Sequence, residues 1–226
     1  GDLDFERLRG VFAGLIRRHE SLRTSFHIID GEPVQTIARR ELALDLEEYR
    51  MPEEEALAFM RESFVKPFDL RKPPLLRVAV IETGKNRYVL AVCLHHIIAD
   101  GSSMALLMRE FMQLYHGETL TPPRLRYADY CQWQNSAAQK EAIKKQEKFW
   151  QQQFEAGVPR LNLPTDFPRS ELRSLEGSSI IFRFTPGETR EIKELAAHRD
   201  VTLYMFLLAA YNVFLSKVTG QEDIVV

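Results

Sequence analysis

The 226-residue sequence has little of what marks the specialised classes of protein. It contains two cysteines, Cys93 and Cys131, and they lack the CxxC spacing of a thiol-bound metal or a redox site. No signal peptide is visible, and no apolar run approaches the roughly 20 residues needed to cross a bilayer. We therefore expect a cytoplasmic protein with reduced cysteines and without a membrane partner.

An excess of charge of either sign is also missing. The sequence has 30 Lys and Arg against 32 Asp and Glu, a formal net charge of −2, and its basic residues are spread along the chain. Nucleic-acid binding usually requires a basic stripe or patch, so no nucleic-acid partner is expected. With 45% hydrophobic and 27% charged residues, the composition is typical of a globular chain long enough to bury a core.

Hydrophobic periodicity predicts helices that alternate with strands. Helices are expected at 4–19, 52–66, after residue 101, at 127–154, at 185–199 and after the capping residue Thr202. Strands are expected at 22–29, 33–37, 75–82, 87–94 and 178–184, and 223–226 is also strand-like. Asp30-Gly31 supplies the tight turn of a hairpin, and 156–176 reads as a long connection. The pattern predicts an α/β fold with mixed strand directions.

The segment from His95 to Gly101 joins a buried strand to a helix start, a junction where α/β folds often carry their sites. Adjacent side chains on an extended backbone point to opposite faces, so two neighbouring histidines cannot easily chelate one metal, and we expect no metal site. One imidazole can face a cleft and accept a proton near neutral pH. The first amides of the following helix can meet an oxyanion, and the combination fits acyl transfer.

A purely structural interpretation of the same residues stays open. His95 and His96 can be core histidines with satisfied hydrogen bonds, and Asp100 can serve only as a helix N-cap. The methionines at helical spacing after this loop are expected to fill the core, not to hold a cofactor; they are Met104, Met108 and Met112. The other histidines are expected to have no special role; they are His19, His27, His116 and His198.

Three motifs in order resemble the condensation domains of nonribosomal peptide synthetases. Residues 18–26 read RHESLRTSF, similar to the family's RHExLRTxF; residues 95–101 read HHIIADG, similar to HHxxxDG; and residues 127–133 read YADYCQW, similar to YxDYxxW. The resemblance runs over essentially the whole chain but covers only about half of a family member. One departure is Ser102, where many members carry Trp or Val after Asp-Gly.

The resemblance implies a fold like that of chloramphenicol acetyltransferase. This is an α+β two-layer sandwich in which helices flank a mixed sheet. Residues 1–160 would form the N-terminal lobe, 161–176 the connection, and 177–226 the beginning of a second, similar lobe.

The resemblance also implies the reaction and its residues. The family forms an amide bond by acyl transfer from a donor thioester to an acceptor amine, and His96 matches its active-site histidine. Gly101 would contribute its backbone N–H, Asp100 and Arg23 would form a buried ion pair that holds the loop, and His95 would pack inward. No cofactor is bound directly. Donor and acceptor carrier proteins present their substrates on 4′-phosphopantetheine arms, beside neighbouring domains such as the adenylation domain.

Three rival functions remain. An epimerisation domain shares the fold and the HHxxxDG loop, although the RHExLRTxF motif favours condensation. A free acyl-CoA transferase shares mainly HxxxD. The third rival is not an enzyme: half a cleft could bind a carrier protein without turnover.

Overall fold

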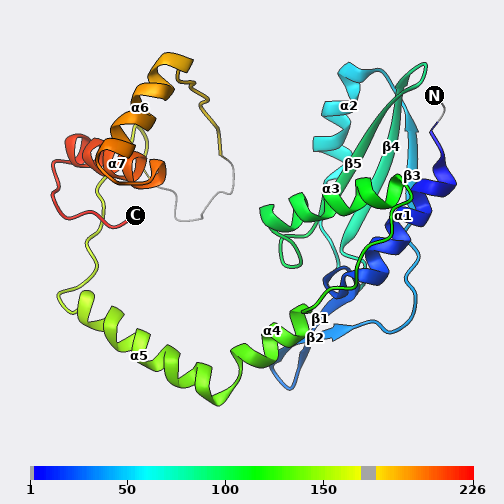
Figure 1. Ribbon diagram of the computed structural model, residues 1–226, viewed down its shortest axis with the longest axis horizontal. Coiled ribbons are helices and arrows are strands. Elements are labelled where there is room, and N and C mark those ends of the chain that lie inside the picture. Colours follow the sequence, from blue (N-terminus) through cyan, green and yellow to red (C-terminus); the bar gives the residue numbers. More distant parts are fainter. Residues whose placement is uncertain (1–2, 169–176) are drawn as a thin grey trace. The chain divides into compact units, whose positions relative to one another are not determined.

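The computed structural model describes residues 3–168 and 177–226. It divides into two compact units, Gly1–Glu141 and Ala142–Val226, called unit 1 and unit 2 below. Figure 1 shows the order of the elements along each unit. The predicted lobe boundaries at 160 and 177 stay a prediction, and part of the predicted connection, 169–176, lies outside the described residues.

Unit 1 begins with the predicted amphipathic helix, α1 (Phe5–Arg18). The Asp4 side chain caps it by accepting a hydrogen bond from the N–H of Arg7 at 2.9 Å. A 3₁₀ turn, η1 (Glu20–Arg23), follows, and for this reason the predicted strand at 22–29 starts two residues late. The hairpin is confirmed: β1 (Thr24–Ile29) pairs antiparallel with β2 (Glu32–Ile37), and Asp30 and Gly31 have φ of 52° and 84° at its turn.

A three-stranded sheet forms the centre of unit 1. The strands β3 (Leu46–Arg50), β4 (Leu76–Gly84) and β5 (Arg87–Leu94) lie in the order β3-β4-β5, with β3 parallel and β5 antiparallel to β4. The predicted mixed strand directions are therefore confirmed. Sequence analysis missed β3, whose run of Leu46, Glu47 and Glu48 is too charged to resemble a buried strand.

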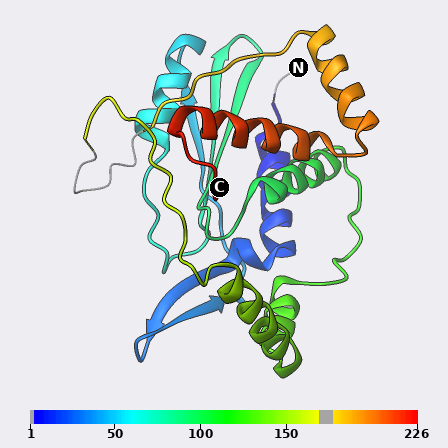
Figure 2. The same cartoon turned by 90° about the vertical axis from the view of Figure 1, so that its left-hand side faces the viewer.

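Helices cover both faces of this sheet (Figures 1 and 2). Because side chains alternate along a strand, Val78 and Val80 of β4 join the core with α1 and α3 (Gly101–Tyr115), whereas Ala79 joins the opposite cluster. That cluster includes Phe59 and Phe64 from the end of α2 (Glu53–Phe59) and the π-turn η2 (Met60–Phe64). The predicted fold class is confirmed, and α2 with η2 adds a layer that the two-layer description lacks.

The predicted helix at 127–154 is two helices. Helix α4 (Tyr127–Gln134) is followed by its C-cap Asn135, whose side-chain amide donates to the carbonyl of Cys131 at 2.9 Å, and α5 (Ala137–Gln153) starts two residues after this cap. Local side-chain bonds of this kind compete with the helical pattern. Both cysteines, Cys93 and Cys131, are free thiols.

Unit 2 contains α6 (Pro186–His198) and α7 (Leu203–Thr219). The predicted capping box is confirmed, since the side chains of Thr185 and Glu188 each accept from the other's backbone N–H; Thr202 caps α7 as predicted. The strands predicted at 178–184 and 223–226 are wrong. A strand requires a neighbour for its backbone groups, and the described part of unit 2 supplies none.

Among the described helices, none is by itself long and apolar enough to span a membrane. The pair α6 and α7, bent by 101° at their junction, meets the test of length and composition when taken together.

Candidate active site

The HHIIADG segment begins where β5 ends. The N–H of His95 donates to the carbonyl of Leu75 at 3.1 Å, and its carbonyl accepts from the N–H of Ile98 at 3.1 Å. The His95 ring is half-buried: its Nδ1 accepts from the N–H of Ile97 at 3.0 Å, and its edge meets Phe68 with the ring centroids 6.1 Å apart. These bonds turn the chain sharply and occupy His95 within unit 1, in keeping with a packing role.

His96 lies in a different environment. It is exposed and lines an open pocket of about 310 Å³, all of whose lining residues belong to unit 1. The walls come from η1, β1, β2, the histidine loop and the starts of α3 and α4; the polar side chains among them are Ser21, Thr24, Gln35, Asp100, Ser103 and Tyr127. An imidazole in this position can reach a ligand and exchange a proton with it.

Asp100 caps the helix that follows the loop. Its Oδ1 accepts from the backbone N–H of Ser103 at 2.8 Å and from the Ser103 hydroxyl at 2.7 Å. The Ser103 hydroxyl and N–H hold the pKa of the Asp100 carboxyl below its usual value, and the positive form of nearby His96 acts in the same direction. The structural interpretation of Asp100 as an N-cap is therefore confirmed.

The predicted ion pair between Asp100 and Arg23 is wrong for this structure. Nε of Arg23 donates to the carbonyl of Ile16 at 3.1 Å, and Nη1 donates to the carbonyl of Ala38 at 2.6 Å. Arg23 thus fastens the end of α1 to the end of β2, while Asp100 is bonded at the head of α3. Each side chain satisfies a nearby backbone group, which leaves neither in position to meet the other.

Gly101 opens α3 beside the pocket. A Cβ added to this residue would meet no atom within 4 Å, so no neighbour in the described chain requires a glycine here. Its φ also lies outside the left-handed region that favours glycine. The structure therefore gives no packing or backbone reason for a glycine here, and the role of the Gly101 N–H as an oxyanion donor stays a prediction.

A buried carboxylate that was not predicted from the sequence links α3 to the end of α1. Glu110 of α3 is 5% exposed, and both its oxygens accept from Nε of Arg18 at 3.1 Å. Its Oε2 also lies 2.5 Å from Nε2 of His19, so the expectation that His19 has no special role is wrong. The sequence held one indication: Glu110 follows Leu107 by three residues and precedes Leu114 by four, so it lies next to apolar side chains on the same helix, and buried carboxylates are rare unless paired.

Glu20, the next residue of the RHExLRTxF motif, contacts the start of α4. Oε1 of Glu20 accepts from Nη1 of Arg126 at 3.1 Å, and the backbone N–H of Arg126 donates to Asp129 at 2.9 Å at the start of α4. Tyr127, the neighbour of Arg126, lines the His96 pocket. Arg18, His19 and Glu20 therefore connect α1 with both α3 and α4. These contacts of Arg18, His19 and Glu20 hold together elements that carry the walls of the His96 pocket.

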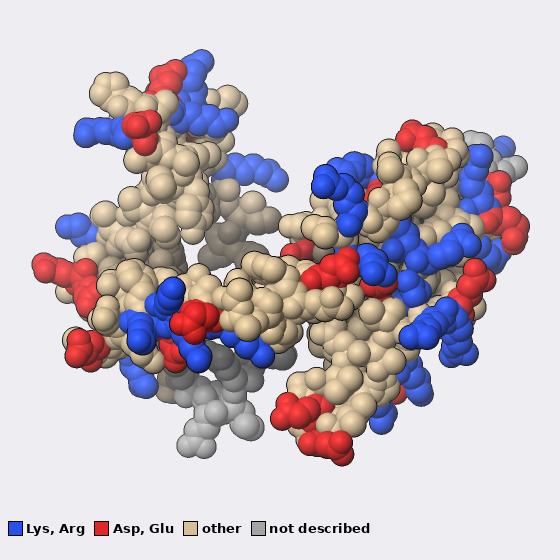
Figure 3. Space-filling model, turned by 60° about the horizontal axis from the view of Figure 1, so that its bottom comes forward, with Lys and Arg blue, Asp and Glu red and all other residues tan. Residues whose placement is uncertain are grey.

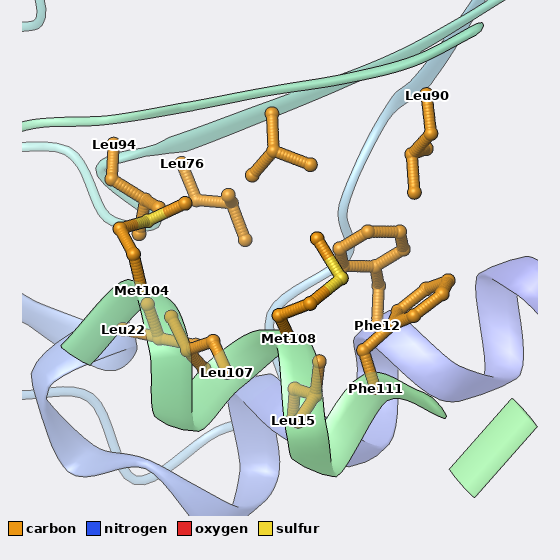
Figure 4. A pocket seen from close by; sticks show the side chains of 11 residues that line it. Phe12, Leu15, Leu22, Leu76, Leu90, Leu94, Met104, Leu107, Met108 and Phe111 are labelled. Atoms are coloured by element: carbon orange, nitrogen blue, oxygen red, sulfur yellow. The ribbon is translucent and has the colours of Figure 1, made fainter. Parts of the chain in front are cut away.

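A second, smaller pocket lies between α1, α3 and the sheet (Figure 4). It measures about 40 Å³, is lined only by apolar side chains, and is covered by Met104 and Met108, which reach from α3 toward the strands. The prediction that Met104, Met108 and Met112 fill the core is wrong in part, because they are 37%, 53% and 45% exposed. Flexible thioethers suit such an irregular, half-open surface.

Comparison with known proteins identifies the family. The family described as "Condensation domain" matches residues 1–226. Tyrocidine synthase 3 of Brevibacillus parabrevis is 47% identical over 226 residues, which are 100% of this chain and 4% of that synthase. Surfactin synthase subunit 1 of Bacillus subtilis (strain 168) is 44% identical over 226 residues, again 100% of this chain and 6% of that protein. The chain thus spans a small fraction of the curated relatives that it matches.

A solved structure agrees with these matches. The condensation domain from the monacolin K polyketide synthase MokA superposes with a TM-score of 0.80 at 25% identity, over 98% of this chain and 53% of that one. The structural match covers 98% of the chain and the sequence matches cover all of it, so fold and sequence relatives agree. The chain belongs to the condensation domain family of the nonribosomal peptide synthetases.

Proposed function

We propose that this chain supplies the active-site histidine for amide bond formation between two carrier-bound substrates. The acyl group passes from the thioester on a donor carrier protein to the amine of an aminoacyl group on an acceptor carrier protein. Family membership supports the reaction class. The observation that carries the residue assignment is the position of His96, exposed in a pocket beside the open amide end of α3.

The reaction makes one bond and breaks one. The acceptor nitrogen attacks the thioester carbonyl carbon, the carbonyl oxygen becomes an oxyanion, and the carbon–sulfur bond then breaks. The proton lost by the nitrogen ends on the departing pantetheine thiol. His96 is the group that aligns the amine and receives that proton, and the Gly101 N–H meets the oxyanion.

Alignment accounts for more of the rate than proton removal does. An α-amino group has a pKa of about 7.7–8.0, so a substantial fraction is already nucleophilic near neutrality. Holding two tethered reactants in line replaces a bimolecular encounter and can be worth about 7–11 kcal/mol. The contacts of Arg18, His19 and Glu20 support this alignment because they fix α1 to α3 and to the start of α4, which carry walls of the pocket.

The partners in this proposal are two carrier proteins, each with a 4′-phosphopantetheine arm, and the adjacent synthetase domains. No cofactor bound directly to this chain is needed, because the thioester already activates the acyl group. The relatives are named as synthases of tyrocidine and surfactin, which is consistent with a peptide product.

Mass spectrometry of carrier-bound products tests the proposal. The complete condensation domain is mixed with a loaded donor carrier and a loaded acceptor carrier, and the species on each carrier are weighed over time. Condensation predicts a dipeptide on the acceptor and an empty donor. Exchange of an α-hydrogen for solvent deuterium without dipeptide would favour epimerisation, and unchanged carriers would favour a lobe that only binds.

A further inference from the structure

A third pocket, open and of about 400 Å³, is lined by residues of α1, by Arg23 and by the segment that follows β2, and it shares no lining residue with the His96 pocket. Its charged lining residues are Arg17, Arg23, Arg39, Arg40 and Glu41, which together carry a formal charge of +3. The sequence hides this cluster, because the arginines come in two groups more than a dozen residues apart. Figure 3 shows Lys and Arg side chains gathered on a face of unit 1, at the right of the picture.

Arg23 is the deepest of these cations. It is half-buried, and its recorded hydrogen bonds go to the neutral carbonyls of Ile16 and Ala38. Among the described residues no carboxylate forms an ion pair with it, with Arg39 or with Arg40. A partly desolvated guanidinium without a counter-charge is unfavourable, and a bound anion would relieve that cost.

The one acidic residue of the pocket cannot neutralise the cluster. Glu41 lies 3.5 Å from Arg17, and the two side chains are 87% and 71% exposed, so their attraction is largely screened by water. Guanidinium groups present planar pairs of donors that match the oxygens of a phosphate. A tetrahedral anion fits this donor set better than a planar apolar group, which would leave the donors unpaired.

We propose that this pocket, called the arginine pocket below, binds a phosphate group, either as the free anion or as an ester. The site is separate from the His96 pocket and goes beyond the proposed function. Two sources share the chemistry: free inorganic phosphate, and the phosphate of a 4′-phosphopantetheine group. Arg23 anchors the anion, Arg17, Arg39 and Arg40 close around it, and Glu41 competes for Arg17.

Isothermal titration calorimetry on the 226-residue chain tests the proposal. Inorganic phosphate and 4′-phosphopantetheine are titrated separately at constant ionic strength, with chloride as the reference anion. The double variant Arg39→Gln/Arg40→Gln should weaken phosphate binding about tenfold, because charge-assisted hydrogen bonds are lost from an exposed position. Glu41→Gln should strengthen binding about twofold, since it removes the competing carboxylate.

Arg124→Gln is the matched control: Arg124 is exposed and does not line the arginine pocket, so it should leave the affinity unchanged. Tighter binding of 4′-phosphopantetheine than of phosphate would identify the carrier arm as the source, and equal or weaker binding would identify the free anion. The proposal is overturned if neither phosphate binds above the chloride reference. It is also overturned if the control weakens binding as much as the double variant does.

Discussion

Helix α1 is amphipathic and α7 is apolar on almost every side, yet α1 is the better buried of the two. Helix α1 has 14 residues and buries five of them, whereas α7 has 17 residues and buries only Leu215. Helix α1 packs against a sheet together with α3, and the described part of unit 2 contains no strand for α7. Apolar periodicity makes a helix, but a second layer is needed to make a core.

The difference extends over the two units. Among the described residues, almost all of the buried apolar side chains belong to unit 1, and only Ala196 and Leu215 of unit 2 are below 4% exposed. Both candidate pockets, around His96 and around Arg23, are lined by unit 1 alone. Unit 1 is therefore the part in which packing can hold functional side chains in place.

The largest effect is expected from matched leucine substitutions in the two units. Leu15→Ala in α1 removes a side chain that is 2% exposed and should lower the free energy of unfolding by about 4 kcal/mol. Leu207→Ala in α7 starts from 41% exposure and should cost less than half of that. Urea unfolding can follow the units separately, because Trp133 lies in unit 1 and Trp150 in unit 2. Equal losses for the two leucines would contradict the conclusion that side chains are packed more tightly in unit 1 than in unit 2.

A somewhat smaller loss is expected when the buried carboxylate of unit 1 is neutralised. Glu110→Gln leaves Arg18 without its partner and should cost about 3 kcal/mol. Glu82→Gln, which breaks the exposed pair with Arg50, is the control and should have a much smaller effect. In the complete domain, Glu110→Asp should recover stability more than activity, because a shorter side chain moves the pocket walls. Full activity in a destabilised Glu110→Gln domain would remove the positioning role.

A smaller loss of stability is expected when a helix cap is removed from unit 2. Thr185→Ala removes the cap of α6 in unit 2 and should reduce stability by about 1 kcal/mol. Thr185→Ser keeps the hydroxyl and should be nearly neutral. The loss should appear at Trp150 in unfolding curves and not at Trp133. An effect seen equally by both reporters would contradict a loss confined to unit 2.

The smallest effect is a pH dependence at the head of α3. The folded state depresses the pKa of Asp100, so its contribution is fully present above the unfolded pKa and is lost as pH falls through the lower, folded value. The melting temperature of the wild type should therefore exceed that of Asp100→Ala above about pH 5, and the gap should close in stronger acid. A gap that stays constant down to pH 2 would mean that the carboxylate charge is irrelevant to the cap.

Much of the fold followed from local patterns. Caps, turns and apolar stripes predicted α1, α3, the hairpin at Asp30-Gly31 and the box at Thr185 because each depends on residues close in sequence. The pairing of strands that are far apart in the sequence was harder to predict. β3 is defined by its partner β4 and not by its own residues, and the segment at 178–184 has strand composition without a strand to pair with.

As with the fold, only part of the candidate site could be predicted from the sequence. The motif placed His96 outward and His95 inward, as the structure has them, although the chain turns at these residues and is not extended. The partner of Arg23 could not be deduced, because an arginine bonds carbonyls as readily as carboxylates when they are nearer. Glu110 needed the packing of α1 on α3 before its role was visible.

We propose that the exposed imidazole of His96 aligns the acceptor amine and receives its proton. The direct test is the rate of dipeptide formation on loaded carriers by the complete domain with His96→Ala, beside His116→Ala as a control at an exposed histidine. We expect a fall of at least about 100-fold for His96→Ala, an unchanged rate for His116→Ala and an unchanged melting temperature for both. Dipeptide formed by His96→Ala at close to the wild-type rate would contradict it.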